Sequence, residues 1–220
     1  MKMFVRGAMI GLLFASFSQA ASVGPTPYLS AADSPWNSVS FSSFYLETFE
    51  DGLLNTLDVT AAGATNVSDA GGQFTDSVDS DNGPIDGFGI SGRSHYTTSG
   101  TTGITYTFGT ATLGQLPTHA GVVWTDLTGA ADVFLEAFDQ NSISLGILAA
   151  GALNDAVSTG ETAEDRFLGW ENPGGISSIR VYQSASDMEL DHLQYGVAVP
   201  EPTTVGLALA AMVLCYCRRG

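Results

Sequence analysis

Few residues of this sequence could carry out catalysis, and their spacing does not favour it. The three histidines, His95, His119 and His192, are far apart, and none has a neighbour at a metal-ligand spacing. No serine lies in a Gly-x-Ser-x-Gly motif, and both cysteines, Cys215 and Cys217, fall near the C-terminus. Carboxylates are the reactive groups that remain, and they are also cation ligands. We predict a protein that is not an enzyme.

Two less favoured alternatives depend on side chains that only the fold can bring together. A carboxylate pair for glycoside hydrolysis, such as Glu136 with Glu171, cannot be recognised from sequence spacing. An extracellular glycan hydrolase therefore stays as a minor alternative. Exposed tryptophans at positions 36, 124 and 170 would suit a sugar-stacking platform, although tryptophan in a β-sandwich is more often part of the core.

A concentration of acidic residues covers residues 76–87. Its Asp79-x-Asp81-Asn82-Gly83 is similar to the start of a calcium loop. The glycine comes one position early for an EF-hand, however, and the twelfth position is Ile90 instead of glutamate. We therefore expect a solvated Asp/Gly turn between strands.

The chain is strongly acidic, with a formal net charge of −16. Between residues 21 and 199 the only basic residues are Arg93, Arg166 and Arg180, against 22 acidic ones, which gives −19 for that part. Such a surface repels phosphate backbones and attracts cations, so nucleic acid is excluded as a partner and a divalent metal is allowed. The same part has no cysteine, so packing must stabilise it without disulfides.

Residues 1–20 have the features of a secretory signal peptide. Lys2 and Arg6 precede an apolar run over residues 7–17, and Ser18 and Ala20 are small residues at the two positions that signal peptidase reads. The run has eleven residues, where about 20 are needed to span a bilayer. We predict export and cleavage after Ala20 by signal peptidase.

Residues 199–220 form a tail in three parts. The parts are, in order, Pro200-Glu201-Pro202, an apolar run over residues 205–216, and the basic pair Arg218-Arg219. As a helix the apolar run would be about 18 Å long against a hydrocarbon core of about 30 Å, which is short for a permanent anchor. The tail resembles the PEP-CTERM sorting signal of Gram-negative bacteria.

The resemblance implies a destination. In that family a membrane protease of the exosortase type recognises the three parts and removes the tail of an exported protein. The chain would then be held transiently in the inner membrane by its C-terminal helix and end at the cell surface or in the extracellular matrix of a Gram-negative bacterium. The alternative is an ordinary C-terminal transmembrane anchor.

Between its two ends the sequence predicts short strands and turns. Residues 104–108 alternate apolar with threonine, and residues 133–138 and 143–148 form a hairpin around the turn 139–142. Further strands are predicted at residues 40–49, 121–125, 166–170, 176–182 and 189–195. No amphipathic helix of ten residues is present. We predict an all-β protein, an antiparallel β-sandwich of the jelly-roll type over residues 40–198, preceded by an extended, unpacked segment at 21–39.

Three motifs in this region resemble exported jelly-roll proteins that carry such a tail. They are TFEDG at residues 48–52, FLEAFD at 134–139 with SLG at 144–146, and DHLQYG at 191–196. The resemblance implies a fold and a place at the cell surface, and little about chemistry.

Jelly rolls that bind carbohydrate commonly hold a structural calcium ion where the first and last strands meet. The carboxylates available there are Glu47, Glu50 and Asp51 near the first strand and Asp191 in the last. Asp191 alternates with apolar residues, so it should point inward, where a buried carboxylate needs a partner. Calcium accepts several such hard oxygen ligands. The alternative is a solvated Asp191 at a strand edge, with residues 50–52 as a simple turn.

Together these features predict an exported, surface-sorted, non-catalytic protein, a structural or adhesive component of the cell envelope or extracellular matrix. The main alternative is a calcium-stabilised carbohydrate-binding module whose partner is an extracellular polysaccharide.

Overall fold

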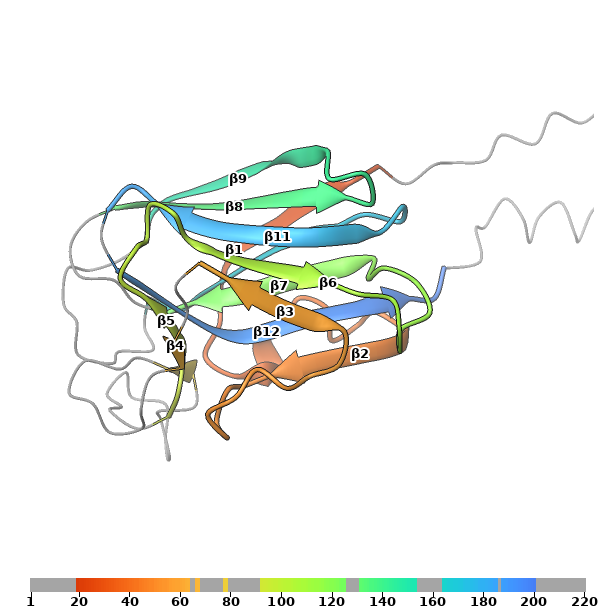
Figure 1. The fold of residues 1–220 in the computed structure, drawn as a ribbon, viewed down its shortest axis with the longest axis horizontal. Coiled ribbons are helices and arrows are strands. Elements are labelled where there is room, and N and C mark those ends of the chain that lie inside the picture. The colour runs from red at the N-terminus through yellow and green to blue at the C-terminus, as the bar shows by residue number, and fades with distance from the viewer. Residues whose placement is uncertain are drawn as a thin grey trace, which may run out of the picture.

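The computed structural model describes residues 19–63, 66–67, 77–78, 92–125, 131–153, 164–185 and 187–200, with only the backbone described at 66–67. These residues form two antiparallel sheets packed as a sandwich (Figure 1). The predicted all-β sandwich is confirmed. Within these ranges no helix has the length and apolar character needed to cross a bilayer.

One sheet has five strands in the order β3-β6-β11-β8-β9. Their bounds are β3 Val59–Ala62, β6 Ile104–Phe108, β8 Asp132–Asp139, β9 Ser144–Ala152 and β11 Ile176–Gln183. Figure 1 shows β9, β8, β11, β6 and β3 one below the other. The predicted hairpin is confirmed as β8 and β9, with the backbone N–H of Asp139 donating to the Ile143 carbonyl at 2.9 Å.

The other sheet has seven strands in the order β1-β10-β7-β12-β5-β4, with β2 also paired to β12. Their bounds are β1 Ala21–Pro27, β2 Phe41–Glu47, β4 Asn66–Val67, β5 His95–Thr97, β7 His119–Trp124, β10 Arg166–Glu171 and β12 Met188–Ala198. One edge of β12 contacts β7, while its other edge pairs first with β5 and, from Leu193 on, with β2. The change of partner coincides with a bulge at His192, whose φ is +43°.

Alternate residues of both sheets meet in one main core. Its largest members include Phe49, Tyr106, Phe108, Trp124, Trp170 and Tyr195, each at most 7% exposed. Both faces of β7 are buried from Ala120 to Trp124. A smaller cluster on the outer face of the seven-stranded sheet contains Tyr28, Trp36, Val78, Val123 and Phe167.

The prediction of an unpacked segment at residues 21–39 is wrong. β1 pairs with β10, and the two large aromatic residues that follow, Tyr28 and Trp36, are 0% and 2% exposed. The prolines of β1 are tolerated because β1 is an edge strand, with one side free of ladder hydrogen bonds. A single 3₁₀ turn, η1, covers Ala31–Asp33 and is capped by Ser30.

Several predicted features lie outside the described residues. They are residues 1–18 of the signal peptide with Ser18, most of the acidic stretch 76–87, and residues 201–220 with Glu201, Pro202, Arg218 and Arg219. Of the other predicted processing residues, Ala20 packs against the main core and Pro200 is exposed.

Candidate functional site

Glu47, one of the predicted calcium ligands, is buried and bonded to the backbone. Its side chain is 5% exposed, and its two carboxylate oxygens accept hydrogen bonds from three backbone N–H groups. The donors are Phe49 at 3.1 Å, Asn55 at 2.9 Å and Thr56 at 3.0 Å. Glu47 therefore fixes the turn that follows β2.

Asp191 is 0% exposed, but it does not point into the main core as predicted: its cross-strand partner Val123 belongs to the outer cluster, because the bulge at His192 breaks the alternation with Leu193. Its Oδ2 accepts from the Ser77 hydroxyl and from the Val78 backbone N–H, both at 2.9 Å, and its Oδ1 accepts from the His192 N–H at 2.6 Å. The Ser77 hydroxyl also lies 3.5 Å from Glu50. Ser77 thus connects the carboxylates of Glu50 and Asp191.

The groups around these carboxylates are largely N–H and O–H donors, whereas calcium needs oxygen lone pairs. Asp51 follows the same pattern, because its Oδ1 accepts from the Leu53 N–H at 2.9 Å and its Oδ2 from the Asn55 amide. No group of three or more His, Cys, Asp or Glu among the described residues is arranged to hold a metal ion. Calcium at Glu47, Glu50, Asp51 and Asp191 stays a prediction.

The three tryptophans do not form a sugar-stacking platform. All three tryptophans are at most 7% exposed, which confirms the expectation that they belong to the core. On the outer face of the five-stranded sheet, Tyr182 stacks on Phe134 with 5.2 Å between ring centroids, and the Arg180 guanidinium lies 4.6 Å from the Tyr182 centroid. These groups cover one another's ring faces.

The carboxylate pair considered for glycoside hydrolysis does not form. Glu136 alternates with the buried Leu135 and Ala137 and so faces outward from the five-stranded sheet. Glu171 lies on the outer face of the other sheet, beside Trp36. The two carboxylates are therefore on opposite sides of the sandwich and cannot act on one bond.

A hollow of about 420 Å³ lies at one end of the sandwich, between three connections. Its lining comes from the β6–β7 connection with Thr110, Gln115, Leu116 and Thr118, from the β8–β9 turn with Gln140, and from the β10–β11 turn with Pro173, Gly174 and Gly175. None of these eight residues is charged. The hollow combines neutral hydrogen-bonding side chains with small apolar surfaces, in the size range of small-ligand sites.

Two carboxylates hold the connections that form this hollow. Asp58 Oδ2 accepts from the backbone N–H groups of Thr112 at 2.5 Å and Leu113 at 2.7 Å. Asp139 Oδ1 accepts from the Ile143 N–H at 2.9 Å, and this bond is the main reason why the pKa of Asp139 is lowered. Both turns are thus fixed through charge-assisted bonds to the backbone.

Asn172 fixes the third connection. Its side-chain oxygen accepts from the Gly174 N–H at 3.2 Å, and its amide donates to the Gly175 carbonyl at 2.7 Å. Gly175 has a φ of +92°, and a Cβ there would lie 2.9 Å from the Cβ of Leu116. Glycine is therefore required where this turn meets the hollow's apolar wall.

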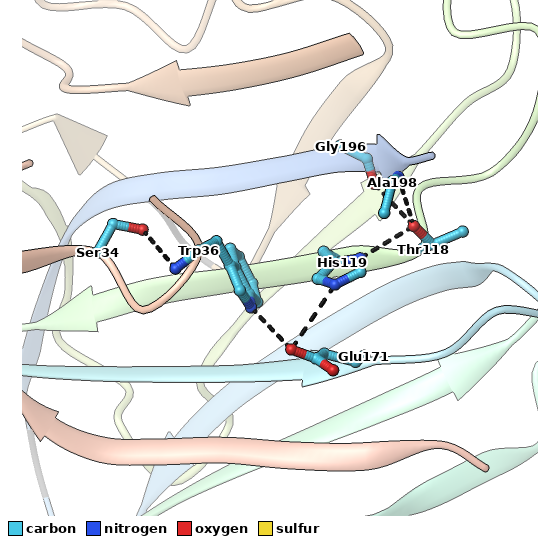
Figure 2. A network of polar contacts seen from close by, with 7 residues as sticks. All are labelled: Ser34, Trp36, Thr118, His119, Glu171, Gly196 and Ala198. Carbon is cyan, nitrogen blue, oxygen red and sulfur yellow. Dashed lines mark hydrogen bonds and ion pairs between the residues drawn. The ribbon is translucent and has the colours of Figure 1, made fainter. Parts of the chain in front are cut away.

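A network of polar contacts connects Thr118 with Trp36 of the outer cluster (Figure 2). The Thr118 hydroxyl lies 2.9 Å from Nδ1 of His119, and Nε2 of His119 lies 3.6 Å from Oε1 of Glu171. The same Glu171 oxygen accepts from the indole N–H of Trp36 at 3.2 Å. The network therefore connects the lining residue Thr118 to the segment that carries Trp36.

The order of hydroxyl, imidazole and carboxylate is that of a catalytic triad, but the hydroxyl here is a structural tie. Thr118 Oγ1 accepts from the Ala198 N–H at 2.9 Å and lies 3.4 Å from the Gly196 carbonyl, so it joins β7 to the end of β12. The 3.6 Å separation of His119 and Glu171 also exceeds hydrogen-bond length.

Burial lowers the pKa of His119, and the neighbouring Glu171 carboxylate opposes this effect. The imidazole ring lies edge-on between Trp36, at 5.4 Å between centroids, and Phe41, at 5.2 Å. A neutral His119 therefore serves as packing for the aromatic residues of the outer cluster.

The described part of the chain is a β-sandwich with a hollow of about 420 Å³ at one end. No protein-family model and no curated protein sequence matches the chain. Among solved structures it is similar to the CBM22-1–GH10 modules of xylanase 10B from Clostridium thermocellum, solved with xylohexaose, at 12% identity over 69% of this chain and 28% of that one, with a TM-score of 0.38. It is also similar to a xylan-binding domain from CBM22, at 14% identity over 74% of this chain and 97% of that one, with a TM-score of 0.36. These similarities are too low to assign a ligand to this chain.

Sequence reasoning missed the residues that line the hollow. Thr110, Gln115 and Gln140 are neutral residues in turns, a composition shared by most surface loops. The one usable signal was the run Asn172-Pro173-Gly174-Gly175, which marks a tight turn but not what the turn encloses.

Proposed function

We propose that this chain is an exported, non-catalytic glycan-binding module of the jelly-roll type, with its ligand site in the hollow between the three connections. The observation that carries the proposal is the lining of that hollow: the uncharged hydrogen-bonding side chains of Thr110, Gln115 and Gln140 beside Leu116 and Pro173.

This lining suits a sugar for a chemical reason. Each sugar hydroxyl both donates and accepts a hydrogen bond, and so do the glutamine amides and threonine hydroxyls of the lining. The C–H faces of a sugar ring are apolar, and Leu116 and Pro173 offer apolar surface beside the polar groups. A reaction would need an acid, base or nucleophile in the hollow, and none of its lining residues is a carboxylate, histidine or cysteine.

Removal of the lining amides is expected to weaken glycan binding without unfolding the protein. The double variant Gln115→Ala, Gln140→Ala should lose at least about tenfold in affinity, because each neutral hydrogen bond contributes on the order of 1 kcal/mol. Glycan-array binding followed by calorimetry measures this effect. Thr110→Ala changes a lining residue, and Thr107→Ala changes an exposed side chain of β6 outside the lining. Only the first of this matched pair should reduce affinity. Equal affinities for all these variants would contradict the proposed site.

The proposal includes the predicted route to the surface, with signal peptidase acting after Ala20 and an exosortase-type protease acting near Pro200-Glu201-Pro202. Replacement of these three residues by alanine should leave a full-length, inner-membrane-bound chain, where the unaltered protein becomes a form that lacks both ends. Intact mass and fractionation from the native host distinguish the two. A tail retained in both versions would instead indicate a plain anchor.

The predicted calcium ion is tested by its removal. If calcium binds, addition of a chelator should lower the melting temperature of the protein by several degrees.

A further inference from the structure

The carboxylates that hold the connections also set the charge around the hollow. Two of the three connections are held by a carboxylate: Asp58 behind the β6–β7 connection and Asp139 at the β8–β9 turn. Asp58 and Asp139 accept backbone N–H bonds, which hold both carboxylates in place behind the turns.

Positive charge is not available to balance these groups at the site. The eight lining residues include no arginine or lysine. Arg166 begins β10 at the end opposite to Glu171, and Arg180 donates to the carbonyls of Thr101 and Thr102, outside the three connections. The surroundings of the hollow are therefore anionic, in a chain whose net charge is −16.

We infer that the hollow selects neutral glycans and rejects those that carry uronate or sulfate groups. This inference rests on the proposed glycan-binding function. A carboxylate or sulfate in the hollow would find no cation in the lining to pair with and would lie near the Asp58 and Asp139 carboxylates, while a neutral hydroxyl at the same place would be unaffected. At moderate salt such repulsion over several ångströms amounts to about a tenfold loss in affinity.

The test uses the purified protein on an array of neutral oligosaccharides and of uronate- and sulfate-bearing oligosaccharides. Binding confined to neutral glycans, or at least about tenfold stronger for a neutral oligosaccharide than for the uronate of equal linkage and length, is the expected result. Equal or stronger binding of the anionic glycans overturns the inference and leaves the proposed function standing. Binding of no glycan overturns both.

Two variants assign the selection to this site. Asp139→Asn keeps an oxygen that can accept from the Ile143 N–H but removes the charge, and Gln140→Lys places a cation in the lining. Both variants should reduce the difference in affinity between neutral and anionic glycans, and Gln140→Lys should reduce it more. Thr107→Lys on exposed β6 is the control for added charge. A narrowing by Thr107→Lys as large as that by Gln140→Lys would show that overall charge, and not the hollow, sets the preference.

Discussion

Replacing Trp36 with alanine is expected to lower the free energy of unfolding by about 3 to 5 kcal/mol, the usual cost of deleting a large buried aromatic side chain. Trp36 is 2% exposed and lies edge-on to Phe167 with 4.8 Å between ring centroids. Its ring covers Gly169 so closely that a Cβ there would come within 3.1 Å. Its indole N–H also donates to Glu171.

Protection from proteolysis should decrease most near the N-terminus, because Trp36 lies in the segment that crosses the outer face of the seven-stranded sheet. Urea denaturation measures the change, and limited proteolysis should show new cleavage between residues 28 and 41. Trp36→Phe is the matched control, since it keeps a ring and loses the N–H, and it should cost less. A cost below about 1 kcal/mol for Trp36→Ala would mean that the segment does not stabilise the domain.

Acidification is expected to destabilise the protein through His95, the second large effect. The side chain is 4% exposed, and burial lowers its pKa from 6.5 to about 4. Its Nδ1 lies 2.9 Å from the Tyr106 hydroxyl, and its ring packs against Phe49 at 4.7 Å between centroids. Burial also raises the pKa of Tyr106, with Asp191 and Glu47 adding to the effect, so this phenol stays protonated.

The sign follows from proton uptake by the two states. Between pH 6.5 and about 4 the unfolded chain binds a proton at His95 and the folded chain does not. The contribution of a neutral His95 to the free energy of unfolding is therefore fully present above pH 6.5 and is lost as the pH falls toward 4. A shift of this size corresponds to about 3 kcal/mol over the whole interval.

Urea unfolding at several pH values between 7 and 4, for the unaltered protein and for His95→Asn, isolates this effect. The carboxylates contribute similarly to both proteins, so the difference in slope reports His95. The variant should lose less stability on acidification, even if it is less stable at neutral pH. His119→Asn is the control, with a smaller change expected because Glu171 opposes the effect of burial on its pKa. Parallel pH profiles for His95→Asn and the unaltered protein would contradict the prediction.

Strands that follow a strong alternation could be predicted from the sequence. Residues 104–108 match β6, and the predicted hairpin matches β8 and β9 to within a few residues. β1, β3, β4 and β5 were missed, because they are short or contain proline and glycine and depend on pairing with distant partners. Pairing across the fold, and not local propensity, defines these strands.

Strand phase could not place Asp191, because the bulge at His192 turns it to the outer face of the sheet, and its partners could not be predicted either. Ser77 and Val78 reach it from more than a hundred residues earlier in the chain. The hollow was harder still, since its three connections come together only when the sheets do, and no local pattern of Thr and Gln marks it. Spacing along the chain constrains neighbours, while a site made of three loops depends on the tertiary fold.

Thr118 links the hollow to the end of β12. This residue lines the hollow and accepts the backbone N–H of Ala198, and the next N–H, of Val199, donates to the Ser40 carbonyl at 2.8 Å. A pull on the chain beyond Pro200 would therefore act first on the end of β12 and, through Thr118, on the wall of the hollow. Under tension the end of β12 would peel from Thr118 and Ser40 before the core felt the force.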